Sequence, residues 1–306
     1  MLEEKYLLDE INKNYHFNMS DIKVLREGGC VSYIASNSNE KYFVKIISNA
    51  FADTAKQSVE VLLYLHERQF PVPEIMMTLS KKPYTQILVQ NELVMLIMLE
   101  YIEGREPDEM EGLEKIGELT GNMHKIMSEY KGILPKHDKR FFIDRYIELL
   151  KEKNYDPVKI ADFIRYGEKV WSRVELLPKG FSHGDLHRGN ILVTKKQQYY
   201  FLDFDTSSLA FPMYDIMVMC NRTDYFNFNK DDLVKSKNAL EQFLVGYLKY
   251  REVSVDERNS FYDLIGIYHY QLQATIIEIY GLKCIDEAFI DSQLEWLMKL
   301  ENSRAY

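Results

Sequence analysis

The pattern of apolar residues changes near Gly104 of this 306-residue chain. Before that point, short runs such as Lys41–Ile47 (KYFVKII) and Leu93–Leu99 (LVMLIML) are rich in β-branched, aromatic and aliphatic residues, as strands are. One stretch, from Asp53 to about residue 69, instead has the apolar spacing of a helix, which Asp53 can cap. The first hundred residues therefore predict a mainly β structure with one long helix.

Other elements follow from the same kind of reading. In the first part we expect a helix over 2–16, strands over 21–25 and 33–35, and a hairpin of 74–79 with 84–89. After Gly104 the spacing is helical over 111–128, 140–153, 157–177, 230–250, 256–281 and 286–303. The strand-like pieces between these helices are 191–194 and 199–202.

These patterns predict an α+β fold with two lobes. We expect a small β-rich N-terminal lobe over residues 1–101 and a large, mostly helical lobe over 102–306. The hydrophobic content of 46% is enough to form a core of this size. Ligands commonly bind in clefts between lobes, so we expect the functional site there.

The strongest chemical pattern is FSHGDLHRGN at 181–190, which a short strand pair and FLDFD at 201–205 follow. Asp185 precedes Asn190 by five residues, the spacing of the protein-kinase catalytic loop, where the Asp is the base and the Asn binds metal. Asp203 then lies where a second metal-binding carboxylate is needed. Each residue alone could be a turn former, but their common register favours phosphoryl transfer.

The two histidines of this segment allow another interpretation. HGDLH could supply alternating metal ligands of a hydrolase, but no other cluster with ligand spacing completes such a shell. We therefore expect His183 to hold the loop through backbone hydrogen bonds. His187 either orients the loop or faces the substrate.

A nucleotide grip is predicted upstream. Lys45 lies within a predicted strand, and if it points inward it needs anions such as ATP phosphates and a glutamate. Glu60, which has apolar neighbours on the long helix, is the candidate glutamate; a solvated helix residue is the alternative. Gly28, Gly29 and Ser32 belong to a loop whose N–H groups could hold phosphate oxygens, although a plain turn fits equally well.

The stretch LIMLEYIEG at 96–104 is an apolar strand that runs into a glycine. In a kinase-like chain it would be the hinge, with the Glu100 carbonyl and the Ile102 N–H facing the adenine. An ordinary buried strand that leaves the sheet would have the same sequence. The hinge is favoured only by the position of this segment in the order of kinase-like motifs along the chain.

These motifs, with MYDI at 213–216, together resemble the aminoglycoside phosphotransferase/choline kinase superfamily. Segment 62–84 is also similar to type II homoserine kinases and bacterial stress-response kinases of that superfamily. The resemblance implies a protein-kinase-like fold that uses ATP and Mg²⁺. It also implies that Asp215 of MYDI braces the catalytic loop from the start of a helix.

The resemblance also implies a role for each matching site residue. Asp185 becomes the catalytic base, and Asn190 and Asp203 become magnesium ligands. Lys45 contacts the phosphates and is oriented by Glu60.

The chain departs from protein kinases after Asp203. Asp205 stands where protein kinases have Gly, and it would bind a second metal, bind a substrate ammonium or cap a turn. No Ala-Pro-Glu segment follows, which favours a small alcohol as acceptor over a docked peptide: an aminoglycoside, choline, homoserine or a sugar. Tyr268, in the polar stretch YHYQ of an apolar helix, is a candidate for lining the acceptor pocket.

Two other functions remain open from the sequence. One is a Ser/Thr protein kinase of the bacterial stress-response type, and the other is a nucleotide-binding pseudokinase. The net charge of −9 disfavours nucleic acid and anionic membranes as partners. Three widely spaced cysteines and an N-terminus unlike a signal peptide favour the cytoplasm.

Overall fold

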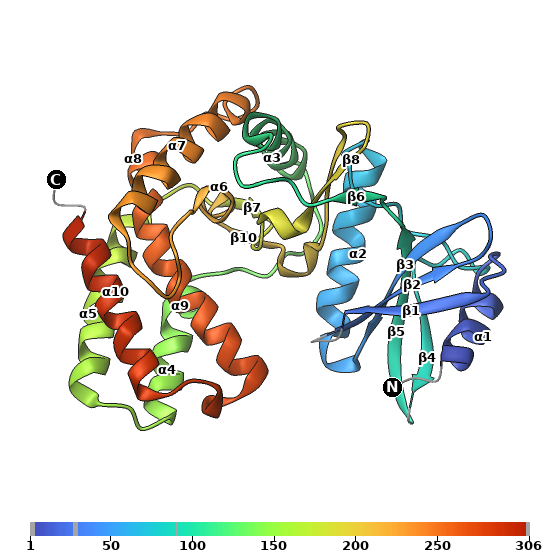
Figure 1. The fold of residues 1–306 in the computed structure, drawn as a ribbon, viewed down its shortest axis with the longest axis horizontal. Helices are drawn as coiled ribbons and strands as arrows, with labels where there is room; N and C mark the ends of the chain where they lie inside the picture. The colour runs from blue at the N-terminus through green and yellow to red at the C-terminus, as the bar shows by residue number, and fades with distance from the viewer. Residues whose placement is uncertain (1–3, 27–29, 90, 304–306) are drawn as a thin grey trace. The chain divides into compact units, whose positions relative to one another are not determined.

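Five antiparallel strands near the N-terminus form one sheet in the order β1-β2-β3-β5-β4 (Figure 1). Their bounds are β1 (Asp21–Arg26), β2 (Cys30–Ser36), β3 (Lys41–Ile47), β4 (Thr85–Val89) and β5 (Glu92–Glu100). The computed structural model describes residues 4–26, 30–89 and 91–303. Strand β3 has the predicted bounds, because its β-branched and aromatic residues fit a pleated surface that packs on both sides.

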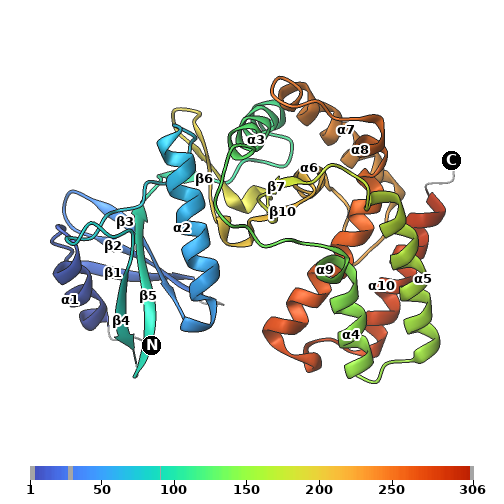
Figure 2. The ribbon, with the colours of Figure 1, turned by 180° about the vertical axis from the view of Figure 1, so that it is seen from behind.

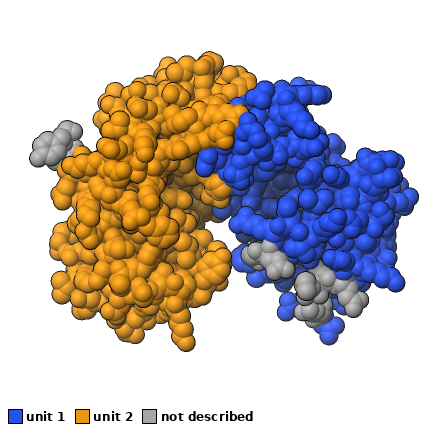
Figure 3. All heavy atoms as spheres, viewed as in Figure 1, with its two compact units in different colours: residues 1–107, 130–133, 188–206 blue, residues 108–129, 134–187, 207–306 orange. Residues whose placement is uncertain are grey.

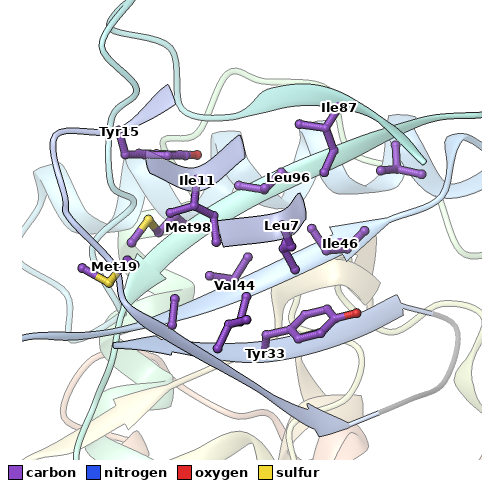
Figure 4. Packing of buried hydrophobic residues seen from close by; sticks show 13 residues of the cluster. Leu7, Ile11, Tyr15, Met19, Tyr33, Val44, Ile46, Ile87, Leu96 and Met98 are labelled. Carbon is purple, nitrogen blue, oxygen red and sulfur yellow. The ribbon is translucent and has the colours of Figure 1, made fainter. Parts of the chain in front are cut away.

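Alternation along these strands separates a core face from a chemical face. Val44 and Ile46 join a buried cluster with Leu7 and Ile11 of helix α1 (Glu4–Asn14) (Figure 4). Lys45, between them in sequence, therefore points to the opposite face.

The second face of the sheet lies toward helix α2 (Ala52–Glu67), which follows the short helix η1 (Asn49–Phe51) (Figures 1 and 2). Its buried side chains include Ala55, Val59 and Leu62. Asp53 lies in the first turn of α2 and not at its N-cap, which is Phe51. In β5, residues 94–99 are all buried, as expected for a strand with packing on both faces.

The predicted hairpin of 74–79 with 84–89 is wrong. Strand β4 pairs with β5, and Ile75 forms a bridge with Leu99 of β5. The N–H of Met76 donates to the oxygen of Met98 at 2.9 Å. Segment 74–79 therefore does not pair with β4. It lies beside the C-terminal end of β5, because β5 is long enough to pair with both β4 and Ile75.

A second, three-stranded sheet has the order β6-β8-β9. Its strands are β6 (Gly104–Arg105), β8 (Ile191–Thr194) and β9 (Tyr199–Phe201), flanked by the short helices η3 (Arg188–Asn190) and η4 (Phe204–Thr206). At Gly104, a Cβ atom would lie 3.0 Å from the backbone oxygen of Val193, so this close strand pairing favours glycine.

The helical part begins with α3 (Leu113–Met127) and contains a short strand pair, β7 (Gly180–Ser182) with β10 (Ser208–Ala210). Its other helices are η2 (Arg140–Asp144), α4 (Arg145–Glu152), α5 (Pro157–Val174), α6 (Pro212–Cys220), α7 (Lys230–Tyr247), α8 (Val255–Asn259), α9 (Phe261–Tyr280), η5 (Leu282–Cys284) and α10 (Glu287–Ser303). The single helix predicted over 256–281 is divided in two at Ser260.

Two glycines allow α3 and α7 to pack closely. A Cβ atom at Gly117 would lie 2.0 Å from the backbone oxygen of Phe243, and one at Gly246 would lie 1.9 Å from that of Glu114. Any larger residue would push the two helices apart.

Segments that are distant in sequence form two compact units (Figure 3). Unit 1 comprises residues 1–107, 130–133 and 188–206, and unit 2 comprises 108–129, 134–187 and 207–306. Unit 1 thus holds the five-stranded and three-stranded sheets with α2, whereas unit 2 is mostly helical, which confirms the predicted α+β class. Within the described part of the chain, no helix has the length and apolarity to cross a membrane.

Candidate functional site

Lys45 is the central cation of unit 1. Its Nζ lies 2.8 Å from Asp203 Oδ1 and 2.9 Å from Asp205 Oδ2, and its side chain is 14% exposed. Burial lowers the pKa of Lys45, but attraction to Asp205 and Asp203 outweighs burial, so the pKa lies above its usual value. The result is a charged lysine held between two carboxylates.

The β8–β9 hairpin brings Asn190 close to the first of these carboxylates. Leu202, which precedes Asp203, donates its N–H to the backbone oxygen of Asn190 at 2.9 Å. Asp203 itself has φ of 59°, a left-handed conformation that non-glycine residues rarely adopt and that is frequent at functional sites. Local hairpin geometry thus brings the backbone of Asn190 against the residue that precedes Asp203.

Glu60 differs from its predicted place. It lies on the exposed side of α2, and the hydroxyl of Tyr130 donates to its Oε2 at 3.5 Å. Among the described residues, the partners of Lys45 are the two aspartates and not Glu60. A buried ammonium needs close anions, and the segment after β9 supplies two of them.

The other predicted nucleotide contacts are distributed along unit 1. Ser32 is buried in β2 and stands directly opposite Lys45 in register, whereas Gly28 and Gly29 lie outside the described residues. Glu100 ends β5 and donates its N–H to the backbone oxygen of Glu74 at 2.8 Å. Ile102 is buried in the segment that leads to β6.

In unit 2 the predicted catalytic loop is held by one fully buried carboxylate, Asp215 of α6. Asp215 Oδ1 accepts from Ser182 Oγ at 2.8 Å and from Gly184 N at 2.9 Å, and Oδ2 accepts from His183 N at 2.7 Å. Burial raises its pKa, but the hydrogen bonds and electrostatic attraction of the groups around it, the hydrogen bond with His124 first, hold the pKa below its ordinary value. Asp215 therefore braces the loop, as the sequence resemblance implied.

His124 of α3 is a further loop-positioning residue that the sequence did not single out. Its Nε2 lies 2.9 Å from Asp215 Oδ2 and its Nδ1 lies 2.7 Å from the hydroxyl of Tyr247 in α7. Arg251 Nη1 donates to that hydroxyl at 3.4 Å. The Tyr247 hydroxyl accepts from Arg251 and donates to His124 Nδ1. His124 then donates from Nε2 to the Asp215 carboxylate, so each hydrogen bond of this network has one donor and one acceptor.

Asp185 follows Gly184, whose φ of 84° makes the sharp turn that glycine tolerates. His187 Nε2 lies 3.5 Å from Asp185 Oδ2, and both side chains are nearly half exposed. Burial and the charge of Asp185 raise the pKa of Tyr268 to about 12. Unit 2 therefore brings together Asp185, His187 and Tyr268, three of the predicted residues.

Comparison with known protein families gives one match. Residues 24–253 match a family described as the phosphotransferase enzyme family, which is most of the chain. The chain belongs to this family. It is therefore an enzyme, a kinase of the small-molecule phosphotransferase type, and the predicted superfamily is confirmed. A comparison with curated protein sequences gives no match.

Solved structures similar to this phosphotransferase have a kinase-like fold. An amicoumacin kinase in complex with AMP-PNP, Ca²⁺ and Ami has a TM-score of 0.76 at 16% identity, covering 98% of this chain and 93% of that one. A microcompartment-associated aminopropanol kinase gives 0.74 at 14%, covering 98% and 95%. A choline kinase from Streptococcus pneumoniae gives 0.62 at 16%, covering 99% and 98%. The predicted protein-kinase-like fold is thereby confirmed.

In this phosphotransferase the predicted site residues form two groups. Lys45, Asn190, Asp203 and Asp205 belong to unit 1, whereas Asp185 belongs to unit 2 with His187 and Tyr268. Asp205 pairs with Lys45. The roles expected for Asp205 from the sequence were to bind a second metal, to bind a substrate ammonium or to cap a turn, and they did not include this ion pair.

Proposed function

We propose that the chain transfers the γ-phosphoryl group of ATP to a hydroxyl group of a small molecule. The observation that carries this proposal is the cluster of Lys45, Asp203 and Asp205, which places a buried cation beside acidic oxygens in a phosphotransferase chain. A lysine and a metal-binding aspartate are the parts with which kinases hold nucleotide phosphates.

The donor set suits magnesium. Asn190 and Asp203 offer an amide oxygen and a carboxylate, and Mg²⁺ is usually bound by one or two protein oxygens together with phosphates and water. When bound, the ion would neutralise charge that develops on the phosphates. The amicoumacin kinase complex contains AMP-PNP and Ca²⁺, which agrees with nucleotide and divalent-cation use in this fold.

The remaining nucleotide contacts are part of the proposal. The N–H groups of Gly28 and Gly29 and the hydroxyl of Ser32 would bind phosphate oxygens. The carbonyl of Glu100 and the N–H of Ile102 would bind the adenine edge. Glu60, exposed on α2 and bonded to Tyr130, is not in this set.

Asp185 would act on the acceptor. Its carboxylate accepts a hydrogen bond from the acceptor hydroxyl and takes the proton as the new O–P bond forms and the bond to the β–γ bridging oxygen breaks. Because the transition state is loose, positioning and electrostatic stabilisation supply most of the rate enhancement. The backbone bonds of His183 and Gly184 to Asp215 would keep Asp185 in place.

Asp185→Ala tests this assignment. We expect turnover with any accepted alcohol to fall at least about 1,000-fold, on the scale of lost general-base and positioning effects, while ATP binding survives. ADP release over a panel of alcohols measures turnover, and calorimetry with AMP-PNP measures binding. Asp162→Ala, which removes a partly exposed carboxylate of α5 that pairs with Arg165, is the matched control. An Asp185→Ala enzyme that retains activity would remove Asp185 from the mechanism.

We also propose a cytoplasmic location, where ATP is available. Cys30, Cys220 and Cys284 are free thiols, which suits a reducing compartment. Fractionation of cells that express the tagged chain would test the location, and secretion with oxidised cysteines would contradict it.

A further inference from the structure

Unit 2 has a larger and a smaller hollow, and the smaller one includes a residue that contacts Asp185. The larger, of about 380 Å³, includes Arg173, whose guanidinium is already paired with Asp263 and Glu301. The smaller, of about 200 Å³, is lined by α6, the segment after it, α9 and His187. Since His187 contacts Asp185, a compact molecule in the smaller hollow would lie beside the proposed base.

The smaller hollow presents uncharged groups. Its described lining residues include no aspartate and no glutamate. His269 of its wall is buried, and burial lowers its pKa to about 4 against the raising effect of Gln293. Gln293 Nε2 donates to the backbone oxygen of Tyr225, so Gln293 Oε1 accepts from His269 Nδ1–H at 2.8 Å. The imidazole is therefore neutral, and its Nε2 is a hydrogen-bond acceptor.

His269 of this wall contacts two other aromatic rings. The ring of His269 stacks on Tyr225, with centroids 4.8 Å apart, and lies tilted against Trp296, with centroids 3.9 Å apart. These two ring contacts hold the imidazole within the wall of the hollow.

Several neutral hydrogen-bonding groups of this wall have no protein partner among the described residues. They are the hydroxyl of Tyr268, the buried hydroxyl of Tyr225 and the amide nitrogen of Asn221. The Oδ1 of Asn221 accepts from both N–H and Oγ–H of Thr223, so the amide nitrogen remains as a donor. Unpaired polar groups at a hollow favour a ligand that carries several hydroxyl groups.

We propose that this hollow is the acceptor site and that it takes a compact, uncharged polyhydroxy compound of the monosaccharide or cyclitol class. The inference rests on the proposed function, because it needs Asp185 to receive the proton of the acceptor hydroxyl. Choline and aminopropanol, after which two of the similar kinases are named, carry ammonium groups. Apart from Asp185 beside the hollow, which is needed to receive the hydroxyl proton, the described wall has no carboxylate to pair with such a group.

Matched acceptors that differ in one group test the proposal. Glucose is compared with glucosamine, and myo-inositol with its monoaminodeoxy analogue, by ADP release with Mg-ATP. We expect kcat/KM to be about tenfold or more higher for the neutral member of an accepted pair, because an unpaired ammonium is costly to desolvate.

Tyr268→Phe should raise KM for the neutral acceptor roughly two- to tenfold, the loss of one neutral hydrogen bond. Tyr146→Phe is the control: it removes a tyrosine hydroxyl of unit 2 that is buried and has no partner among the described residues, but Tyr146 does not line the hollow, so KM should not change.

The outcomes separate the two proposals. Equal or better use of the amine member, or an unchanged KM in Tyr268→Phe, would overturn the acceptor class and leave phosphoryl transfer to alcohols in place. Absence of transfer to every alcohol in the panel, with AMP-PNP still bound, would overturn both.

Discussion

Asp215→Asn isolates the carboxylate that holds the catalytic loop. The best fit of the amide puts its oxygen where Oδ2 accepts from His183 N–H and His124, and its NH₂ group where Oδ1 accepts from Ser182 and Gly184. The Ser182 hydroxyl can rotate and accept from the amide. The N–H of Gly184 then faces a donor and loses its bond.

The cost follows from these contacts. A buried N–H without a partner costs about 1–3 kcal/mol, and the three remaining bonds lose the assistance of the negative charge, so the total is about 2–4 kcal/mol. At roughly 2–4 °C per kcal/mol, the melting temperature should fall by about 5–15 °C. A shift of Asp185 by about 1 Å would lower kcat about 100-fold.

Calorimetry and ADP release measure the two effects. Asp232→Asn is the matched control, because Asp232 is also buried in unit 2 but pairs with Lys235, whose side chain is 61% exposed. We expect the free energy of unfolding of the control to fall by less than about 1 kcal/mol and its kcat to stay unchanged. Wild-type melting and kcat in Asp215→Asn, or equal losses in the control, would refute the role of the carboxylate.

Three other predictions concern different parts of the chain. Asp203→Ala should abolish the magnesium dependence of nucleotide binding, measured by calorimetry with and without Mg²⁺; an unchanged dependence would exclude a metal role. Because burial lowers the pKa of His269 from 6.5 to about 4, the unfolded chain binds the proton first. Stability should be full above pH 6.5 and fall by about 3 kcal/mol toward pH 4 in denaturant titrations, less so in His269→Gln. Gly246→Ala should cost about 3 kcal/mol, because its Cβ would lie 1.9 Å from the Glu114 oxygen; an unchanged melting temperature would contradict the close packing of α3 and α7.

The sequence predicts those features of the site that depend on neighbouring residues. Strand 41–47 is predicted from its own β-branched and aromatic residues. Asn190 lies next to Leu202, which precedes Asp203, because one short hairpin joins the two segments, so their spacing in the sequence indicates that they are neighbours in the fold.

Features that depend on distant partners were not predictable. Segment 74–79 has the composition of a hairpin strand, but Ile75 pairs with Leu99 because β5 is long enough to reach it. Lys45 needs an anion, and the sequence does not say whether Glu60 or Asp205 comes within reach. His124 bonds to Asp215, 91 residues away, through helix packing that no local pattern encodes.

The contact of Trp296 with His269 has a practical consequence. The chain has two tryptophans, and Trp296 contacts His269 in the wall of the proposed acceptor hollow, whereas Trp171 packs against Phe142 and Phe211. In a Trp171→Phe background, the fluorescence of the remaining indole would come from beside that wall. The protein thus carries its own optical reporter, with which acceptors can be screened in solution without a coupled enzyme assay.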